Sequence, residues 1–137
     1  MFFKKYKNKN ENNDLAKVAA LLIHAAKIDE NYSKQEEEII KEALLKIGAT
    51  NENIDLIILD GIKLEGNTNQ ILEFTKEVKN MDHPDKIKII ETLWSIIYSN
   101  KNADIYETNL MRRLAGLLYI DSKIMGDIKE KIKKEYS

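Results

Sequence analysis

The sequence contains no cysteine, which excludes disulfide frameworks, thiolate metal sites and cysteine nucleophiles. It has one proline and five glycines in 137 residues, so few positions interrupt a helix. The most apolar stretch, residues 18–26, is shorter than the roughly 20 residues that span a bilayer. With 22 basic and 23 acidic side chains, the net charge of −1 provides no general attraction to nucleic acid. We therefore expect a cytoplasmic protein that does not bind nucleic acid.

The composition is that of one compact domain, because 43% of the residues are hydrophobic and 33% are charged. We predict a basic flexible leader over residues 1–13 and a single helical domain over residues 14–137. The leader has no apolar core of a secretory signal. A floppy segment and a weak contact with an anionic membrane surface both stay open for it. The residues predicted to make that contact are Phe2, Phe3, Lys4 and Lys5.

Apolar residues recur at spacings of three and four almost throughout, which predicts an all-helical protein. Asp14 is expected to cap the first helix, and Ser33 with Glu36 forms a capping box that opens the second. Gly48 is expected to end the second helix. The first and fifth helices are apolar nearly all round, so they should lie at the centre. We predict about seven helices, over residues 14–28, 33–47, 53–66, 68–78, 84–99, 104–118 and 122–132.

The chain also contains an internal repeat. Helices one to three align with helices five to seven, which predicts two three-helix repeats joined by the fourth helix as a connector. Two central apolar helices, each flanked by amphipathic ones, would pack as in an ordinary helical bundle. Matching pairs include Val18 with Ile89, Leu22 with Leu93, Ile47 with Leu118 and Glu36 with Glu107.

Two interhelical loops, residues 29–36 and 100–107, carry oxygen-bearing side chains at their first, third, fifth and eighth positions. Hard cations such as Ca²⁺ bind several such oxygens at one point. The same residue types also begin and end helices, so a divalent-cation site and plain helix caps both stay open. The first loop is the better candidate, because Lys101 adds a positive charge to the second. The candidate ligands are Asp29, Asn31, Ser33 and Glu36, and Asn100, Asn102, Asp104 and Glu107.

Residues 21–36, echoed by residues 93–107, resemble the TerB-like family associated with bacterial tellurite resistance. The family pattern is a small or apolar helix end, then Asp-Gly, a short polar turn and a glutamate on the next helix, given twice in an all-helical domain. The resemblance places Asp29 and Glu36 at the first acidic pair and Glu107 at the second glutamate.

The chain departs from that pattern where Glu30 and Lys101 replace the glycine and Asn100 replaces the second aspartate. The resemblance implies binding of Ca²⁺ or another divalent cation and a role in metal, tellurite or oxidant stress near the membrane, without catalysis. Since the sequence also lacks phosphate-loop, hydrolase and metalloprotease motifs, we expect neither enzymatic activity nor an organic cofactor. The alternative is a metal-independent adaptor of the protein-interaction or co-chaperone type. A protein partner is expected, with membrane contact at most peripheral to the inner face.

Overall fold

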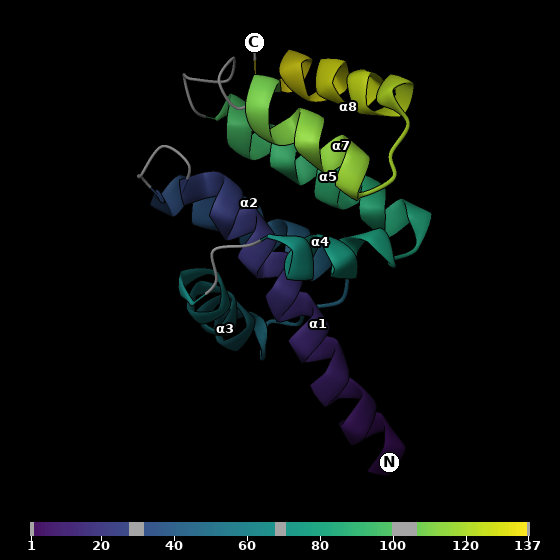
Figure 1. The fold of residues 1–137 in the computed structure, drawn as a ribbon. Helices are drawn as coiled ribbons and strands as arrows, with labels where there is room; N and C mark the ends of the chain where they lie inside the picture. Colours follow the sequence, from purple (N-terminus) through teal and green to yellow (C-terminus); the bar gives the residue numbers. More distant parts are fainter. Residues whose placement is uncertain (1, 28–31, 68–70, 100–106, 137) are drawn as a thin grey trace.

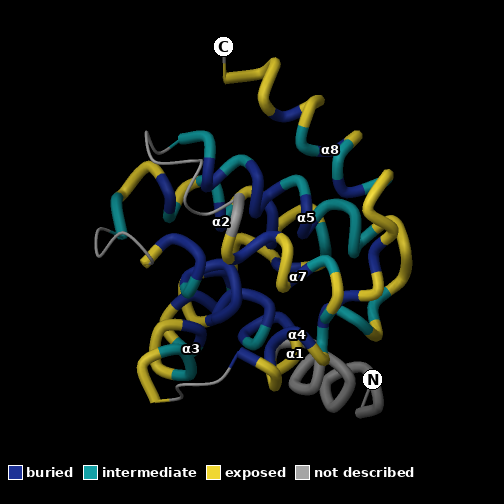
Figure 2. The backbone as a smooth tube through the Cα atoms, turned by 45° about the horizontal axis from the view of Figure 1, so that its top comes forward, coloured by how far each residue is buried: buried dark blue, intermediate teal, exposed yellow. Residues whose placement is uncertain are grey.

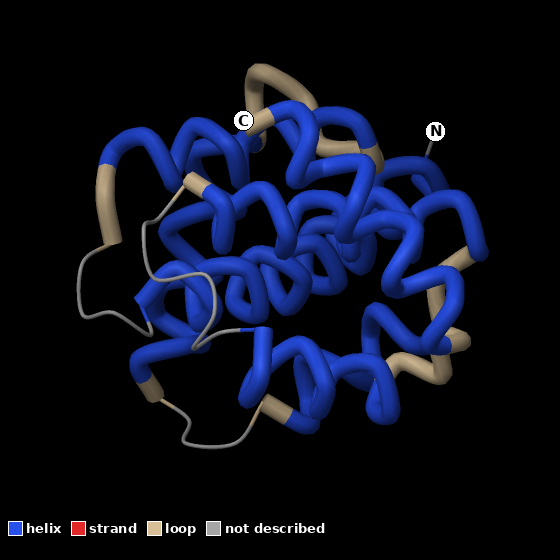
Figure 3. The backbone as a smooth tube through the Cα atoms, turned by 90° about the horizontal axis from the view of Figure 1, so that it is seen from above, coloured by secondary structure: helices blue, strands red, loops and turns tan. Residues whose placement is uncertain are grey.

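The computed structural model describes residues 2–27, 32–67, 71–99 and 107–136, with side chains from residue 13 onward except those of residues 107 and 108. These segments form helices and loops only (Figure 3), so the all-helical prediction is confirmed. The elements are α1 (Phe2–Ala26), α2 (Lys34–Lys46), α3 (Ile54–Gly66), α4 (Leu72–Lys79), α5 (His83–Tyr98), a π-helical turn η2 (Glu107–Met111), α7 (Arg112–Leu117) and α8 (Ser122–Glu135).

Helix α1 runs through the middle of the bundle, with α3 on one side and α5, α7 and α8 on the other (Figure 1). It packs against α2, α3, α4 and α5, and α5 in turn packs against α8. Leu22 of α1 and Leu93 of α5 are fully buried, and buried residues dominate the described stretches 15–26 of α1 and 89–97 of α5 (Figure 2). The prediction that the two apolar helices are central is therefore confirmed, because only a central helix can bury side chains on nearly every side.

Helix α1 begins at Phe2, so Asp14 lies inside it and the prediction that Asp14 caps the helix is wrong. The physical reason is that neither proline nor glycine occurs before Gly48, so nothing in the sequence breaks the helix near residue 14. Side chains of residues 2–12 lie outside the described set, and the leader and membrane-contact hypotheses for them stay predictions. Among the described helices, none combines the length and apolar character needed to cross a membrane.

Helix α2 ends at Lys46, two residues before Gly48, which the sequence predicted as its stop. Gly48 has a φ of +134°, and the backbone N–H of Ala49 donates to the carbonyl oxygen of Leu44 at 2.9 Å. This is the Schellman arrangement, in which the residue after the helix cap takes a positive φ that favours glycine. The turn sends the chain directly into α3.

The described part of the predicted sixth helix begins with the π-helical turn η2, and the helix closes with a second Schellman turn. There the N–H of Ile120 donates to the carbonyl of Ala115 at 3.1 Å, and Tyr119 adopts a φ of 55°. The side chain of Tyr119 is exposed, and the ammonium of Lys79 lies 4.4 Å from its ring centroid. This cation–π contact offsets part of the energetic cost of the left-handed backbone conformation of Tyr119. Tyr119 is the counterpart of Gly48 in the predicted repeat, and the two-repeat arrangement itself stays a prediction.

Helices α1 and α3 approach each other closely at Gly61. A Cβ atom placed on Gly61 would lie 2.8 Å from the Cβ of Ala19 in α1. At the far end of the same interface, the Glu65 carboxylate lies 3.3 Å from Nδ1 of His24 and accepts from Nζ of Lys27 at 2.8 Å. The close contact at Gly61 and the two polar contacts of Glu65 together fix α3 along α1.

Candidate functional site

The candidate cation site lies at the start of α2, where Ser33 and Glu36 have described side chains. Ser33 has extended backbone angles, with φ −85° and ψ 162°. Its Oγ accepts a hydrogen bond from the N–H of Glu36 at 3.1 Å, and its own N–H donates to Oε1 of Glu36 at 2.9 Å. Both halves of the predicted capping box are therefore present, and one carboxylate oxygen of Glu36 is committed to the cap.

The second carboxylate oxygen of Glu36 is the unusual feature of this cap. Glu36 is 4% exposed, although a capping glutamate on a surface helix is ordinarily solvated. Its Oε2 is buried and has no hydrogen-bond partner within the described part of the chain. An ionised oxygen in such a place loses its hydration without compensation, which is costly unless a cation or a donor reaches it.

Tyr32, the residue before the cap, lies close to the carboxylates of Glu36 and Glu37. Its side chain packs against the core. The pKa of the Tyr32 hydroxyl is raised above its usual value of 10.0, first by burial and then by the negative charges of Glu37 and Glu36. Tyr32 is therefore a neutral phenol at physiological pH. Nothing in the sequence distinguishes Tyr32, because only the residues of the capping box beside it follow a recognisable pattern.

The structure tests only part of the predicted ligand set. The described residues contain no group of three or more His, Asp or Glu side chains arranged to hold a metal ion. Ser33 and Glu36 alone would thus supply too few oxygen ligands to hold a divalent cation. The side chain of Glu107, at the start of η2, is outside the described set. The other candidate ligands lie outside the described residues altogether: Asp29, Asn31, Asn100, Asn102 and Asp104.

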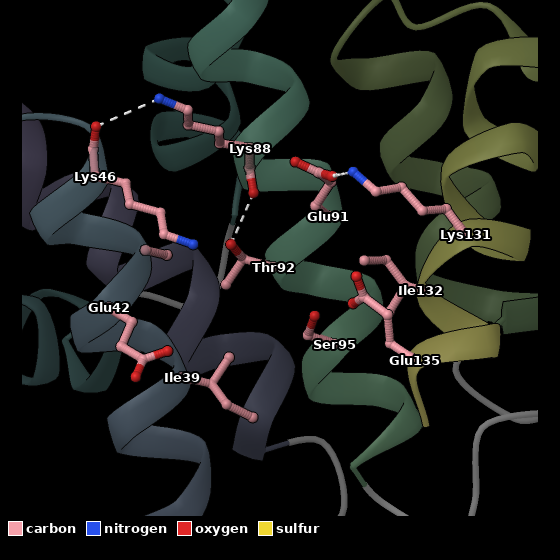
Figure 4. A pocket seen from close by; sticks show the side chains of 11 residues that line it. Ile39, Glu42, Lys46, Lys88, Glu91, Thr92, Ser95, Lys131, Ile132 and Glu135 are labelled. Carbon is pink, nitrogen blue, oxygen red and sulfur yellow. Dashed lines mark hydrogen bonds and ion pairs between the residues drawn. The ribbon is translucent and has the colours of Figure 1, made fainter. Parts of the chain in front are cut away.

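A polar groove of about 320 Å³ lies farther along α2, between that helix, α5 and α8 (Figure 4). Its charges are balanced, since three lysines and three glutamates line it. Lys131 pairs with Glu91 at 2.5 Å, and Nζ of Lys88 donates to the carbonyl of Lys46 at the end of α2 at 3.5 Å. These contacts join three helices and leave no excess charge of one sign, so the groove is explained by helix packing.

Comparison with known proteins gives one finding. A family model described as tellurite resistance protein TerB matches residues 15–130, which include α2, its capping box and both interhelical loops. No curated protein and no solved structure gives a significant match.

Proposed function

Because the chain belongs to the TerB family, over residues 15–130, we propose that it is a non-enzymatic domain that binds a divalent cation at residues 29–36. We further propose that this binding serves a response to metal, tellurite or oxidant stress. The observation that supports the proposal is the buried Oε2 of Glu36, which has no hydrogen-bond partner within the described residues.

The residues at this turn suit a hard cation. Ca²⁺ and Mg²⁺ bind carboxylate, amide and hydroxyl oxygens, and a buried ionised oxygen is the donor such an ion prefers. Glu36 would hold the ion through Oε2 while Oε1 keeps the cap intact. Asp29 and Asn31, and the hydroxyl of Ser33, are the further donors that the sequence places in the same turn. The second loop would be the weaker half, because Asn100 is uncharged and Lys101 repels a cation.

Calorimetric titration of chelator-treated protein with Ca²⁺, Mg²⁺ and Mn²⁺ tests the proposal. We expect saturable binding of at least one ion, weakened about tenfold or more by Glu36→Gln, because an amide is a poorer ligand than a carboxylate. Glu38→Gln is the matched control, since Glu38 is exposed on the same helix, and it should change the affinity less than about twofold. Asp29→Ala should weaken binding far more than Asn100→Ala. Absence of heat at millimolar concentrations of all three ions would rule the site out.

A second candidate function, the adaptor, is favoured by a different observation. Helix α3 carries an apolar stripe on its outer side, formed by Leu56 (54% exposed), Leu59 (55% exposed) and Ile62 (37% exposed). These positions recur at a spacing of three, so they share one helix face, and the exposed turns of α3 are visible in Figure 2. An exposed apolar face of this kind is typical of protein-interaction surfaces.

If the domain is an adaptor, the double variant Leu56→Gln with Leu59→Gln should no longer recover a partner in a pull-down. Its fold should be unchanged. Both side chains are largely in solvent, so the free energy of unfolding should move by no more than about 0.5 kcal/mol for each substitution. Recovery should be the same with and without chelator. A partner that the double variant still captures, or that chelator releases from the wild type, argues against this function.

A further inference from the structure

A second cavity, of about 450 Å³, lies between α5, the η2–α7 segment and α8. Its size is within the range of pockets that bind small organic molecules. Most of its wall is apolar: Trp94 comes from α5, Met111 and Ala115 from the η2–α7 segment, and Met125 and Gly126 from α8. Neither Ser33 nor Glu36 is among the described residues that line it, so this cavity is separate from the capping box at the start of α2.

The polar groups of the cavity are almost all hydrogen-bond donors of positive or neutral charge. Among the described residues that line the cavity they are Arg112, Ser122 and Lys129, and none of these described lining residues is an aspartate or a glutamate. Arginine and lysine side chains can donate but cannot accept, and the serine hydroxyl can do both. A ligand that satisfies this wall must therefore supply acceptors, and a negative charge suits it best.

Trp94 forms part of the inner, aromatic wall of the cavity. Its side chain is 2% exposed, and its Nε1 is buried without a hydrogen-bond partner in the described part of the chain. A buried N–H without an acceptor is destabilising, and few are left so in native proteins. The ammonium of Lys129 lies 6.0 Å from the centroid of the same ring, so positive charge is held at the aromatic wall. Lys129 also takes part in another interaction, and only its charge and position matter here.

We propose that this cavity binds a small anionic amphiphile, a molecule with one carboxylate or phosphate group on an apolar body. The anionic group would bind at Arg112 and Lys129, and the apolar body would pack against Met111, Met125 and the ring of Trp94. The groove between α2, α5 and α8 differs from this cavity, because its lysines are matched by an equal number of glutamates. It therefore gives no preference for anionic over cationic ligands.

Fluorescence titration tests the proposal directly, because Trp94 is the only tryptophan in the chain and lines the cavity. The probes are decanoate, decyl phosphate, decyltrimethylammonium and inorganic phosphate, each below its micelle concentration. We expect saturable changes with decanoate or decyl phosphate at midpoints at least about tenfold lower than with decyltrimethylammonium, and none with inorganic phosphate. The two anionic probes distinguish a carboxylate ligand from a phosphate ligand. Equal midpoints for the anionic and cationic amphiphiles would overturn the proposal.

Three variants distinguish binding in this cavity from general detergent binding. Calorimetry is the second measurement, because Lys129→Gln changes the surroundings of the Trp94 indole and so its fluorescence. Arg112→Gln with Lys129→Gln should raise the midpoint for the better anionic probe about tenfold or more. Arg113→Gln with Lys133→Gln removes the same charge from neighbouring exposed positions and should change it less than about twofold. Gly126→Leu should abolish binding by filling the cavity while the fold persists, since a Cβ at Gly126 meets nothing within 4 Å. Unchanged binding in the first variant, or in Gly126→Leu, contradicts the proposal.

Discussion

Gly61→Ala is expected to lower the free energy of unfolding by about 1–3 kcal/mol, although alanine is the better helix former by about 1 kcal/mol. The added Cβ would lie 2.8 Å from the Cβ of Ala19 and 3.3 Å from the carbonyl oxygen of Ala16. Both atoms belong to rigid parts of α1, so no side-chain rotation can relieve the overlap. The helices must separate, and separation would loosen the packing of buried Ile57 and Ile58 against the core.

Gly126→Ala is the matched control, because it makes the same chemical change inside α8 at a position where a Cβ meets nothing within 4 Å. It should raise the free energy of unfolding by about 0.5–1 kcal/mol through helix propensity and reduced freedom of the unfolded chain. Urea denaturation of both variants measures the difference. If Gly61→Ala were also stabilising, the close approach of α1 and α3 would not be a constraint of the fold.

The helix ends illustrate how much of this fold the sequence predicts. Gly48 was identifiable as a stop, because glycine is the residue most often found at a positive φ after a helix. Tyr119 adopts the same kind of turn at the end of α7, but tyrosine carries no local signal for it. There the conformation is imposed by the surrounding structure, including the contact of Lys79 with the ring. The start of α1 was missed for the opposite reason, since Asp14 resembles a cap and nothing nearby breaks the helix.

The two candidate sites differ in how far the sequence could predict them. The capping box is local, so the spacing of Ser33 and Glu36 was enough to predict it. The unpartnered oxygen of Glu36 depends on how deeply the core buries the start of α2, and a pattern of neighbours along the chain does not contain that information. The cavity beside Trp94 was not predictable at all, because its wall comes from segments far apart in the sequence and exists only once α8 has packed on α5.

The buried carboxylate leads to the last prediction, which concerns the sign of a stability change. In chelator, Glu36→Gln should leave the free energy of unfolding unchanged or raise it by about 1 kcal/mol. The amide keeps an oxygen to accept from the N–H of Ser33, and burying a neutral amide costs less than burying a half-satisfied carboxylate. With the cation at about 100 times its dissociation constant, the wild type gains about 2.7 kcal/mol and Glu36→Gln gains little. The variant should therefore be the more stable protein in chelator and the less stable one with the ion.

This reversal in the order of stability distinguishes a role of Glu36 as a cation ligand from a role as a helix cap alone, because a cap contributes the same stability in chelator and in cation. Urea denaturation in chelator and in saturating cation measures it, and Glu38→Gln, at an exposed position on the same helix, should follow the wild type in both. If Glu36→Gln is destabilised by the same amount with and without the ion, Glu36 serves α2 as a cap alone. In that case the exposed apolar face of α3 becomes the better account of what this domain does.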